Sequence, residues 1–127
     1  MFGKLRNMKT LLIDDDEFVR DSFKLMFESK GCVLVAVETA EEALELLETF
    51  VYDIVITDYK LPGMDGLELC KKIQETHPDA VKILITAFGT QALEEESGGV
   101  GVYEIIEKPI TSEAFEASLS RLFDGAA

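Results

Sequence analysis

The sequence predicts an α/β protein whose five-stranded parallel sheet is doubly wound, with helices on both faces. Two observations support this fold class. Five short aliphatic runs alternate with amphipathic stretches along the 127 residues. The first four runs are nearly continuous in aliphatic residues, which is typical of strands buried on both faces of a parallel sheet. Strands that alternate with helices form βαβ units, and their crossovers are right-handed in nearly all proteins.

Each predicted strand is a short apolar run bounded by polar residues. The strands are residues 10–13, 33–37, 54–57, 83–86 and 102–106. The fifth run, Val-Tyr-Glu-Ile-Ile, mixes apolar and polar side chains, as an edge strand can.

Between the strands, apolar side chains recur at helical spacing. In the first helical stretch they stand at i, i+4, i+7 and i+8: Val19, Phe23, Met26 and Phe27. The polar residues between them, Arg20, Lys24 and Glu28, are expected on the other side of this helix. The second helix carries Ala40, Ala43, Leu44 and Leu47. Thr39 precedes this helix and Glu42 lies in its first turn, at the spacing of a capping box.

The later helices are bounded by local signals. A third helix is predicted from about Asp65 to Thr76, because it must stop before Pro78, and the last one begins near Thr111. The stretch 91–100 is weaker, since two consecutive glycines cost about 2 kcal/mol of helix propensity relative to alanine. It is therefore expected to be a short, mobile or displaced helix.

The chain is expected to form a single domain over residues 9–127, because no linker, repeat or low-complexity segment interrupts the pattern. Residues 1–8 are assigned as an N-terminal extension, and residues 1–7 are expected to be loose. This N-terminus lacks the apolar core of a secretory signal. There is also no apolar stretch of about 18 residues that could span a membrane.

Composition excludes several classes of function. Hydrophobic residues make up 47% of the chain, enough for a core, and the net charge is −13. Nucleic-acid binding requires a basic face that displaces counterions, so direct binding is not expected. An anionic membrane surface is disfavoured for the same reason. Cys32 and Cys70 lie in apolar segments and are expected to be reduced core residues of a cytoplasmic protein.

Charged or hydroxyl side chains stand at the carboxyl ends of four predicted strands. They are Asp14, Asp15 and Asp16 after the first strand, Asp58 at the third, Thr86 at the fourth and Lys108 after the fifth. In an open parallel sheet these ends meet at one edge, where ligands bind, so the side chains are expected to share a cleft. Each residue alone has a structural explanation, and Asp16 is expected to cap the next helix. Their joint placement favours a functional site.

Carboxylates gathered in this way repel one another and need a compensating cation. An all-oxygen site suits Mg²⁺ or Mn²⁺ better than zinc, which prefers His or Cys. The only histidine, His77, is expected at the surface. A metal ion beside an exposed carboxylate indicates phosphoryl transfer, in which the carboxylate attacks phosphorus and a lysine stabilises the phosphate oxygens.

From about Lys9 to Phe123 the chain resembles the receiver domains of bacterial two-component response regulators. The motifs that carry the resemblance are Leu-Leu-Ile-Asp14-Asp15-Asp16-Glu, Ile-Val-Ile-Thr-Asp58-Tyr-Lys-Leu-Pro62-Gly63-Met-Asp65-Gly66, Ile-Leu-Ile-Thr86-Ala87-Phe-Gly and Glu-Lys108-Pro109. The resemblance implies the flavodoxin-like strand order 2-1-3-4-5. It also implies a domain that catalyses only its own phosphorylation and dephosphorylation and is otherwise not an enzyme.

The resemblance assigns roles to the residues at the strand ends. Asp58 is implied to be the phosphoacceptor, with Thr86 and Lys108 binding oxygens of the phosphoryl group. The implied cofactor is Mg²⁺. Its implied ligands are the side chains of Asp15 and Asp58 and the backbone carbonyl of Lys60, with Asp14 acting partly through water. The Lys108–Pro109 peptide bond is implied to be cis, a conformation otherwise seldom adopted.

The partners implied by the resemblance are a histidine kinase or a phosphotransfer protein, which donates the phosphoryl group from a phosphohistidine. A downstream effector domain or protein is a further implied partner. A phosphorylation-dependent dimer through the surface of the fourth helix and fifth strand is left open. We expect either a stand-alone receiver or a part of a larger regulator.

One position departs from the family pattern. The family commonly places an aromatic residue three positions before the lysine, where Ile105 stands here. Tyr103, two residues earlier, is expected to point to the same face as Ile105. The aromatic part of the family's switch is therefore not supported by the sequence.

Two rival functions remain open. Asp14-Asp15-Asp16 after an aliphatic strand also resembles the opening of haloacid-dehalogenase-like phosphatases, in which Asp14 would be the nucleophile, but their later acidic motif is not visible. The second rival is a pseudo-receiver that binds partners without being phosphorylated. The presence of all five residues Asp14, Asp15, Asp58, Thr86 and Lys108 speaks against it.

Overall fold

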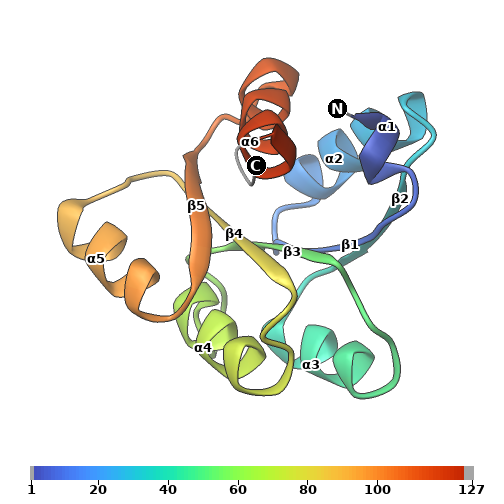
Figure 1. Ribbon diagram of the computed structural model, residues 1–127. Helices are drawn as coiled ribbons and strands as arrows, with labels where there is room; N and C mark the ends of the chain where they lie inside the picture. The colour runs from blue at the N-terminus through green and yellow to red at the C-terminus, as the bar shows by residue number, and fades with distance from the viewer. Residues whose placement is uncertain (1, 125–127) are drawn as a thin grey trace.

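The polypeptide folds around a five-stranded parallel sheet in a computed structural model that describes residues 2–124 (Figure 1). The strands are β1 (Lys9–Ile13), β2 (Val33–Val37), β3 (Ile54–Asp58), β4 (Val81–Thr86) and β5 (Val102–Glu107). Their order across the sheet is β2-β1-β3-β4-β5, and all neighbouring pairs are parallel. The predicted fold class and strand order are confirmed.

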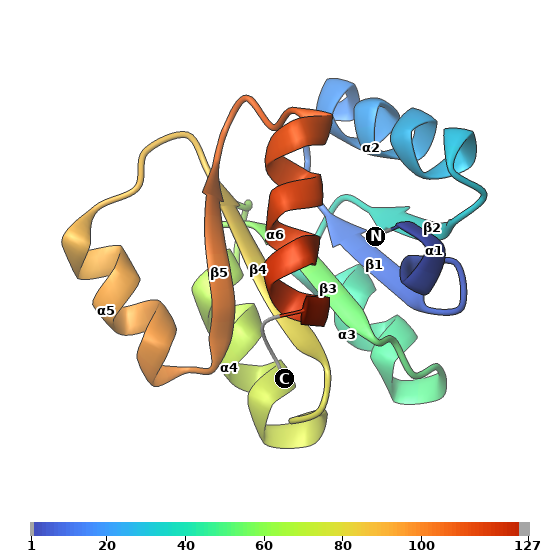
Figure 2. The ribbon, with the colours of Figure 1, turned by 45° about the horizontal axis from the view of Figure 1, so that its top comes forward.

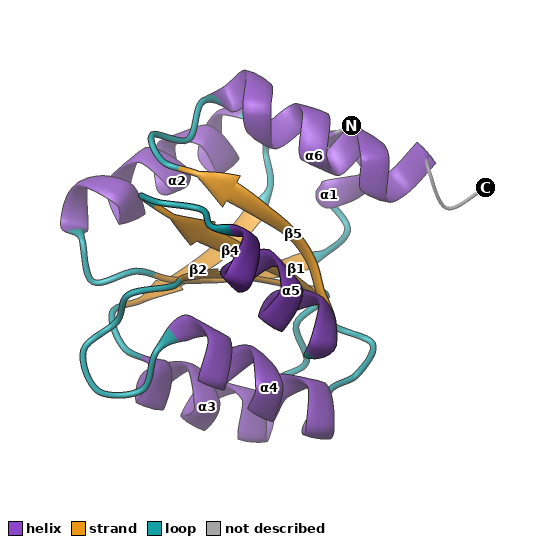
Figure 3. Ribbon diagram, turned by 90° about the vertical axis from the view of Figure 1, so that its left-hand side faces the viewer, coloured by secondary structure: helices purple, strands orange, loops and turns teal. Residues whose placement is uncertain are grey.

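Helices cover both faces of the sheet. They are α1 (Phe2–Leu5), α2 (Glu17–Ser29), α3 (Ala40–Thr49), α4 (Gly66–Thr76), α5 (Gln91–Gly99) and α6 (Ser112–Asp124). Figure 3 shows α1, α2 and α6 on one face and α3 and α4 on the other. Helix α5 packs beside the edge strand β5. No helix within residues 2–124 is long and apolar enough to cross a membrane.

Side-chain caps fix where the helices begin. The predicted cap of α2 is confirmed, since the Asp16 carboxylate accepts the backbone N–H of Phe18 at 2.9 Å. Thr39, Asp65 and Thr90 cap α3, α4 and α5 in the same way. Each cap satisfies a backbone N–H group that has no partner inside its helix. Even the glycine-containing segment 91–100 therefore forms a helix, α5, with a defined start.

Two hydrophobic clusters hold the helices against the sheet. On one face, Leu12 and Ile56 of the sheet pack with Phe23 and Phe27 of α2 and with Phe115 of α6. The other cluster joins β1 and β3 to α3 and α4: Leu11, Val55, Ala43, Leu47, Leu69 and Ile73. Both cysteines are buried, as predicted, and neither forms a disulfide within the described chain. Burial raises the pKa of the Cys70 thiol to about 12.

Strand β2 is less buried than the sequence predicts. Its aliphatic run suggests a strand covered on both faces, yet Val33 is 51% exposed and the remaining residues are only partly buried. The reason is its position, because β2 is an edge strand whose only neighbour in the sheet is β1. An aliphatic run alone does not distinguish a central strand from an edge strand.

The first residues of the chain are packed against the domain. Leu5, the last residue of α1, is fully buried in the cluster that contains Phe115 and Leu119 of α6. Arg6 Nε donates a hydrogen bond to the backbone carbonyl of Lys30, after α2, at 2.7 Å. The prediction that this segment is loose is therefore wrong for residues 2–7. One buried leucine in so short a helix leaves no periodic pattern in the sequence.

Replacing Leu5 with alanine tests how much α1 contributes to the fold. We expect Leu5→Ala to lower the free energy of unfolding by about 2–5 kcal/mol, the usual cost of removing a buried leucine side chain. The matched change Leu25→Ala removes a side chain that is 69% exposed and should alter stability by about 0.5 kcal/mol at most. Urea denaturation of the two variants measures both values. Equal effects would contradict a structural role for α1.

Candidate functional site

The sheet topology brings the predicted site residues to one edge. Asp14 follows the last residue of β1, Asp58 and Thr86 are the last residues of β3 and β4, and Lys108 follows β5. Figure 2 shows that the strands run toward the same edge. In the register of the sheet, Ile13 is opposite Thr57, so the residues after it lie beside Asp58. Four segments of the chain thus meet there.

Three carboxylates form the acidic part of this site. Asp14, Asp15 and Asp58 each place an oxygen atom within 4.8 Å of the other two. Asp14 is fully buried and Asp58 nearly so, whereas Asp15 is exposed. Three clustered carboxylates, one of them facing solvent, fit a hard divalent cation such as Mg²⁺, which binds carboxylate oxygens and keeps several waters.

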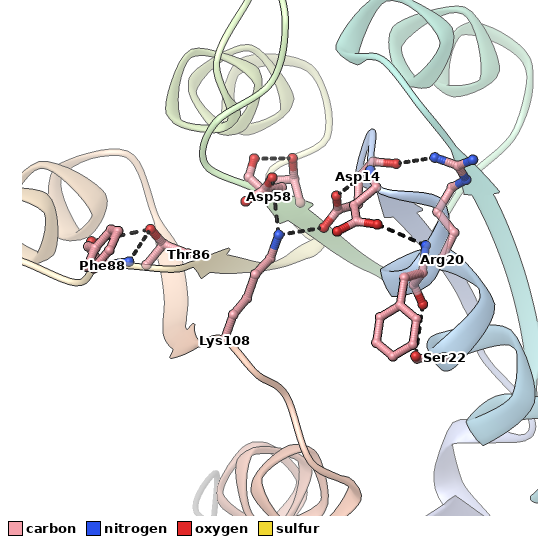
Figure 4. A network of polar contacts seen from close by, with 10 residues as sticks. Asp14, Arg20, Ser22, Asp58, Thr86, Phe88 and Lys108 are labelled. Atoms are coloured by element: carbon pink, nitrogen blue, oxygen red, sulfur yellow. Dashed lines mark hydrogen bonds and ion pairs between the residues drawn. The ribbon is translucent and has the colours of Figure 1, made fainter.

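Lys108 is the cation that pairs with the buried carboxylates. Its Nζ lies 3.0 Å from Asp14 Oδ2 and 3.3 Å from Asp58 Oδ2. Figure 4 shows the three side chains pointing toward one another from three different strand ends. The peptide bond from Lys108 to Pro109 is cis, as predicted. One ammonium group compensates only part of the charge of three carboxylates.

The charge balance is visible in the acid–base properties of the site. Burial raises the pKa of the Asp58 carboxyl, and the Asp14 and Asp15 charges raise it further, while Lys108 acts in the opposite direction. For Lys108, burial lowers the pKa, but the hydrogen bond and charge of Asp14 and the charge of Asp58 outweigh burial, so the pKa rises. The ionised form of Asp58 is therefore destabilised in the folded protein when no metal ion is bound.

We expect Asp58→Asn to stabilise the metal-free protein at neutral pH. Above the ordinary pKa of aspartate, the unfolded chain releases a proton that folded Asp58 retains until its raised pKa is reached. The free energy of unfolding therefore falls as the pH rises through this window, and it stays lower above it. Asp58→Asn removes this pH-dependent loss of stability. Urea denaturation in EDTA, from acidic to neutral pH, measures the free energy of unfolding of both proteins. If this free energy changed with pH in the same way in both, the expectation would be contradicted.

Arg20 belongs to the site, although the sequence pattern places it on the solvent side of α2. Its side chain is only 13% exposed. Arg20 Nη1 donates to the backbone carbonyl of Asp14 at 2.9 Å, and Nη2 pairs with Glu38 Oε1, after β2, at 3.3 Å. The guanidinium group thus fixes the turn that carries the acidic residues. Helical periodicity could not reveal this role, because one partner of Arg20 is a backbone carbonyl and the other, Glu38, lies outside its helix.

Thr86 lines the same hollow as Asp58 and Lys108, a cavity of about 400 Å³. Its hydroxyl accepts the backbone N–H of Phe88 at 3.2 Å and donates to the Phe88 carbonyl at 3.3 Å. Figure 4 shows this hydroxyl next to Phe88, on the far side of Lys108 from Asp14. Thr86 is therefore held by the loop after β4 and forms no hydrogen bond with Asp58 in this structure.

The loop after β3 completes the site. Lys60 lines the cavity beside Asp58, and its carbonyl remains only a predicted metal ligand. The loop closes where the Gly66 N–H donates to the Tyr59 carbonyl at 2.8 Å. Gly66 lies so close to Asp58 that a side-chain Cβ at this position would overlap the Asp58 carbonyl oxygen. His77 lies at the end of α4 and is not part of the carboxylate cluster.

Tyr103 is the extra residue of an irregularity in β5. Its neighbours Val102 and Glu104 pair with consecutive residues of β4, which leaves Tyr103 without a partner in the ladder. The Tyr103 hydroxyl donates to the Ser118 carbonyl in α6 at 3.3 Å. The prediction that Tyr103 shares a face with Ile105 is therefore wrong, because the extra residue interrupts the alternation of the strand.

Comparison with known families identifies one that covers nearly the whole chain. The family model described as the response regulator receiver domain matches residues 10–120. Among solved structures, a CheY-like response regulator receiver domain protein from Methanospirillum hungatei is similar, with a TM-score of 0.86 and 28% sequence identity. The match covers 93% of this chain and 94% of that one.

Two curated relatives are regulatory proteins. The chain is 36% identical over 110 residues to the C4-dicarboxylate transport transcriptional regulatory protein DctD of Rhizobium meliloti. This match covers 87% of this chain and 24% of DctD. It is 34% identical over 117 residues to the uncharacterized transcriptional regulatory protein YesN of Bacillus subtilis, and this match covers 90% of this chain and 32% of YesN. The chain thus spans less than a third of either relative.

Proposed function

The chain belongs to the response regulator receiver domain family, and we propose that it is a signalling switch phosphorylated on Asp58. The observation that carries this proposal is the cluster of Asp14, Asp15 and Asp58 around one lysine at the carboxyl edge of the sheet. Asp58 ends its strand beside an open cavity, so an incoming phosphate group can approach it. Asp14 is fully buried and is less suited to attack.

In the proposed step, an oxygen of the Asp58 carboxylate attacks the phosphorus of a phosphohistidine. A P–O bond forms as the P–N bond breaks, and the imidazole leaves and takes up a proton. The products are an aspartyl phosphate and a neutral histidine. Lys108 lies within 3.3 Å of the attacking carboxylate and offers its ammonium group to the phosphate oxygens. Thr86, at the opposite wall of the cavity, can offer its hydroxyl once it leaves Phe88.

Asp14, Asp15 and Asp58 are proposed to hold Mg²⁺, with the Lys60 carbonyl as a further ligand. The bound ion would neutralise negative charge on the phosphate and on the carboxylates. The residues present fit such an ion. Among the described residues, the buried Asp14 Oδ2 has the Lys108 ammonium group, at 3.0 Å, as its one polar partner, and no His or Cys side chain joins the three clustered carboxylates.

The proposal is tested by incubating the chain with Mg²⁺ and a small phosphodonor such as acetyl phosphate, followed by intact mass measurement. We expect the mass of a phosphoryl group to be added, and the addition to be lost when EDTA replaces Mg²⁺. A chain that gains no mass under these conditions would instead be a pseudo-receiver. The phosphatase alternative is not supported, because the family match covers residues 10–120.

The proposed phosphoryl donor is a histidine kinase or a phosphotransfer protein in the cytoplasm. The proposed output is a downstream effector domain or protein. Relatives such as DctD and YesN are regulatory proteins of transcription by name, and they are about three to four times as long as this chain. A phosphorylation-dependent dimer through α5 and β5 is a further proposal, and direct nucleic-acid binding by this domain is not proposed.

Arg20 is proposed to position the metal-binding turn, and Arg20→Ala tests this role. Without the hydrogen bond to the Asp14 carbonyl (2.9 Å), we expect the dissociation constant for Mg²⁺ to rise by about tenfold, as is usual when the support of a ligand residue is removed. Isothermal titration calorimetry measures the constant, and thermal unfolding in EDTA reports any general loss of stability.

The matched control is Arg121→Ala, which also removes a guanidinium group with an ion pair, here to Glu104 at 2.7 Å. We expect this variant to bind Mg²⁺ as the natural chain does. If both variants weaken Mg²⁺ binding equally, Arg20 has no specific effect on the acidic turn. Arg20→Lys keeps the charge and should recover part of the affinity.

A further inference from the structure

Positive charge is gathered at the amino edge of the sheet, opposite the edge that carries Asp58. The chain has 12 basic and 25 acidic residues, yet Lys4, Arg6, Lys9 and Lys30 lie at neighbouring, exposed positions. Arg6 Nε donates to the Lys30 carbonyl at 2.7 Å, and Lys9 begins β1. Figures 1 and 2 show that α1 lies beside the starts of β1 and β2.

Lys4, Arg6 and Lys9 contact neutral groups. Lys4 Nζ lies 5.6 Å from the centre of the Phe123 ring in α6, and Lys9 Nζ lies 5.8 Å from the centre of the Phe50 ring after α3. Among the side chains of residues 3–123, Lys4, Arg6 and Lys9 form no ion pair with a carboxylate. Their charge therefore remains available in a chain that has a twofold excess of acids.

The acidic groups nearby offset only part of this charge. The exposed Asp53 carboxylate keeps its negative charge while it accepts the backbone N–H of Lys9 at 2.8 Å. Glu28 is exposed in the last turn of α2, and it is the only acidic residue in the stretch 22–37.

Exposed apolar side chains lie among the basic residues. Val33 is directly opposite Lys9 at the starts of β1 and β2 and is 51% exposed. Phe50, under the Lys9 ammonium group, is 47% exposed. Aromatic side chains and arginine are enriched in protein–protein contacts, and the rim of such contacts is polar. We call these six residues the amino-edge surface: Lys4, Arg6, Lys9, Lys30, Val33 and Phe50.

We propose that the amino-edge surface binds an acidic, amphipathic segment of a partner protein. Carboxylates of the segment would face Lys4, Arg6 and Lys9, and its apolar side chains would cover Val33 and Phe50. Charge complementarity of this kind speeds association and selects the partner. Lys4, Arg6 and Lys9 precede the part of the chain that matches the family model, which begins at residue 10.

A protein segment fits this surface better than a polyanion does. The net charge of −13 repels nucleic acids and anionic bilayers at long range, and their binding depends on many simultaneous phosphate contacts. Two exposed apolar side chains among four cations match a ligand that is itself part acidic and part apolar. The surface lies at the edge opposite Asp58, so binding there does not require phosphorylation.

The test uses a fluorescent synthetic peptide of about 15 residues, long enough to form a helix, with glutamate on one face and leucine on the other. Fluorescence anisotropy measures its dissociation constant for the natural chain, for Lys4→Glu/Lys9→Glu and for the control Lys71→Glu/Lys72→Glu. The control reverses two exposed lysines on α4 and changes the net charge by the same amount. Thermal unfolding checks that each variant is folded.

We expect the natural chain and the control to bind the peptide equally, and Lys4→Glu/Lys9→Glu to bind at least about tenfold more weakly. A peptide with serine in place of leucine should also bind more weakly. The proposal is overturned if no binding occurs, if both charge variants lose affinity equally, or if the serine peptide binds as well. It is also overturned if the amino-edge variant loses binding only to vesicles of phosphatidylcholine and phosphatidylglycerol, which would indicate a membrane site.

Discussion

Replacing Asp58 with alanine is expected to abolish the phosphoryl adduct that forms with Mg²⁺ and a small phosphodonor. Asp58 is the nearly buried carboxylate that lines the cavity between β3, β4 and the loop after β5, and no other carboxylate in the described chain combines this position with a 3.3 Å contact to Lys108. Without the Asp58 carboxylate, the remaining residues can still bind charged groups, but no nucleophile is present to form the new P–O bond. Intact mass measurement distinguishes the two outcomes.

The control for this loss is Asp16→Ala. Asp16 belongs to the same acidic run, but its carboxylate caps α2 through the N–H of Phe18 at 2.9 Å. Its removal is expected to cost about 1 kcal/mol of stability and to leave the adduct in place. If Asp16→Ala abolished the adduct, or if Asp58→Ala retained it, the assignment of Asp58 as nucleophile would be wrong.

The second large effect is expected for Gly66→Ala. A Cβ at this position would overlap the carbonyl oxygen of Asp58, which belongs to the backbone and cannot rotate away. Either the loop after β3 or the end of β3 must shift. We expect a loss of about 3 kcal/mol in the free energy of unfolding, at the upper end of the usual cost of overpacking, and slower phosphorylation because Asp58 moves with its backbone.

Gly98→Ala makes the same chemical change at a position where nothing lies within 4 Å of the added Cβ. Because Gly98 is in helix α5, alanine is expected to stabilise the protein by about 0.5–1 kcal/mol. Urea denaturation of the two variants should therefore give changes of opposite sign. Two losses of similar size would show that the close approach at Gly66 has no particular cost.

The fold was predictable because each element has its own local signal. Strands β1, β3 and β4 are aliphatic runs, and Asp16, Thr39 and Asp65 are caps at the starts of helices. Once strands and helices alternate, the parallel sheet follows. The same topology places Asp14, Asp58, Thr86 and Lys108 at one edge of the sheet. These residues of the site could therefore be predicted without knowing any distance between them.

The features that the sequence did not reveal depend on single contacts between distant segments. Leu5 is one buried side chain in a four-residue helix, too short for a period to be recognised. Arg20 reaches a backbone carbonyl outside its own helix, and an extra residue in β5 turns Tyr103 toward α6. A pattern of residue types carries no information about a backbone partner or about a register slip.

The central claim is that topology brings these side chains together so that Asp58 becomes the phosphoacceptor. The most direct measurement locates the modified residue: the phosphorylated chain is treated with borohydride, which reduces the aspartyl phosphate to an alcohol, and its peptides are analysed by mass spectrometry. We expect the reduced residue at Asp58 alone. Reduction at Asp14 or Asp15, or a phosphoryl group that resists borohydride because it is on a hydroxyl, would contradict that claim.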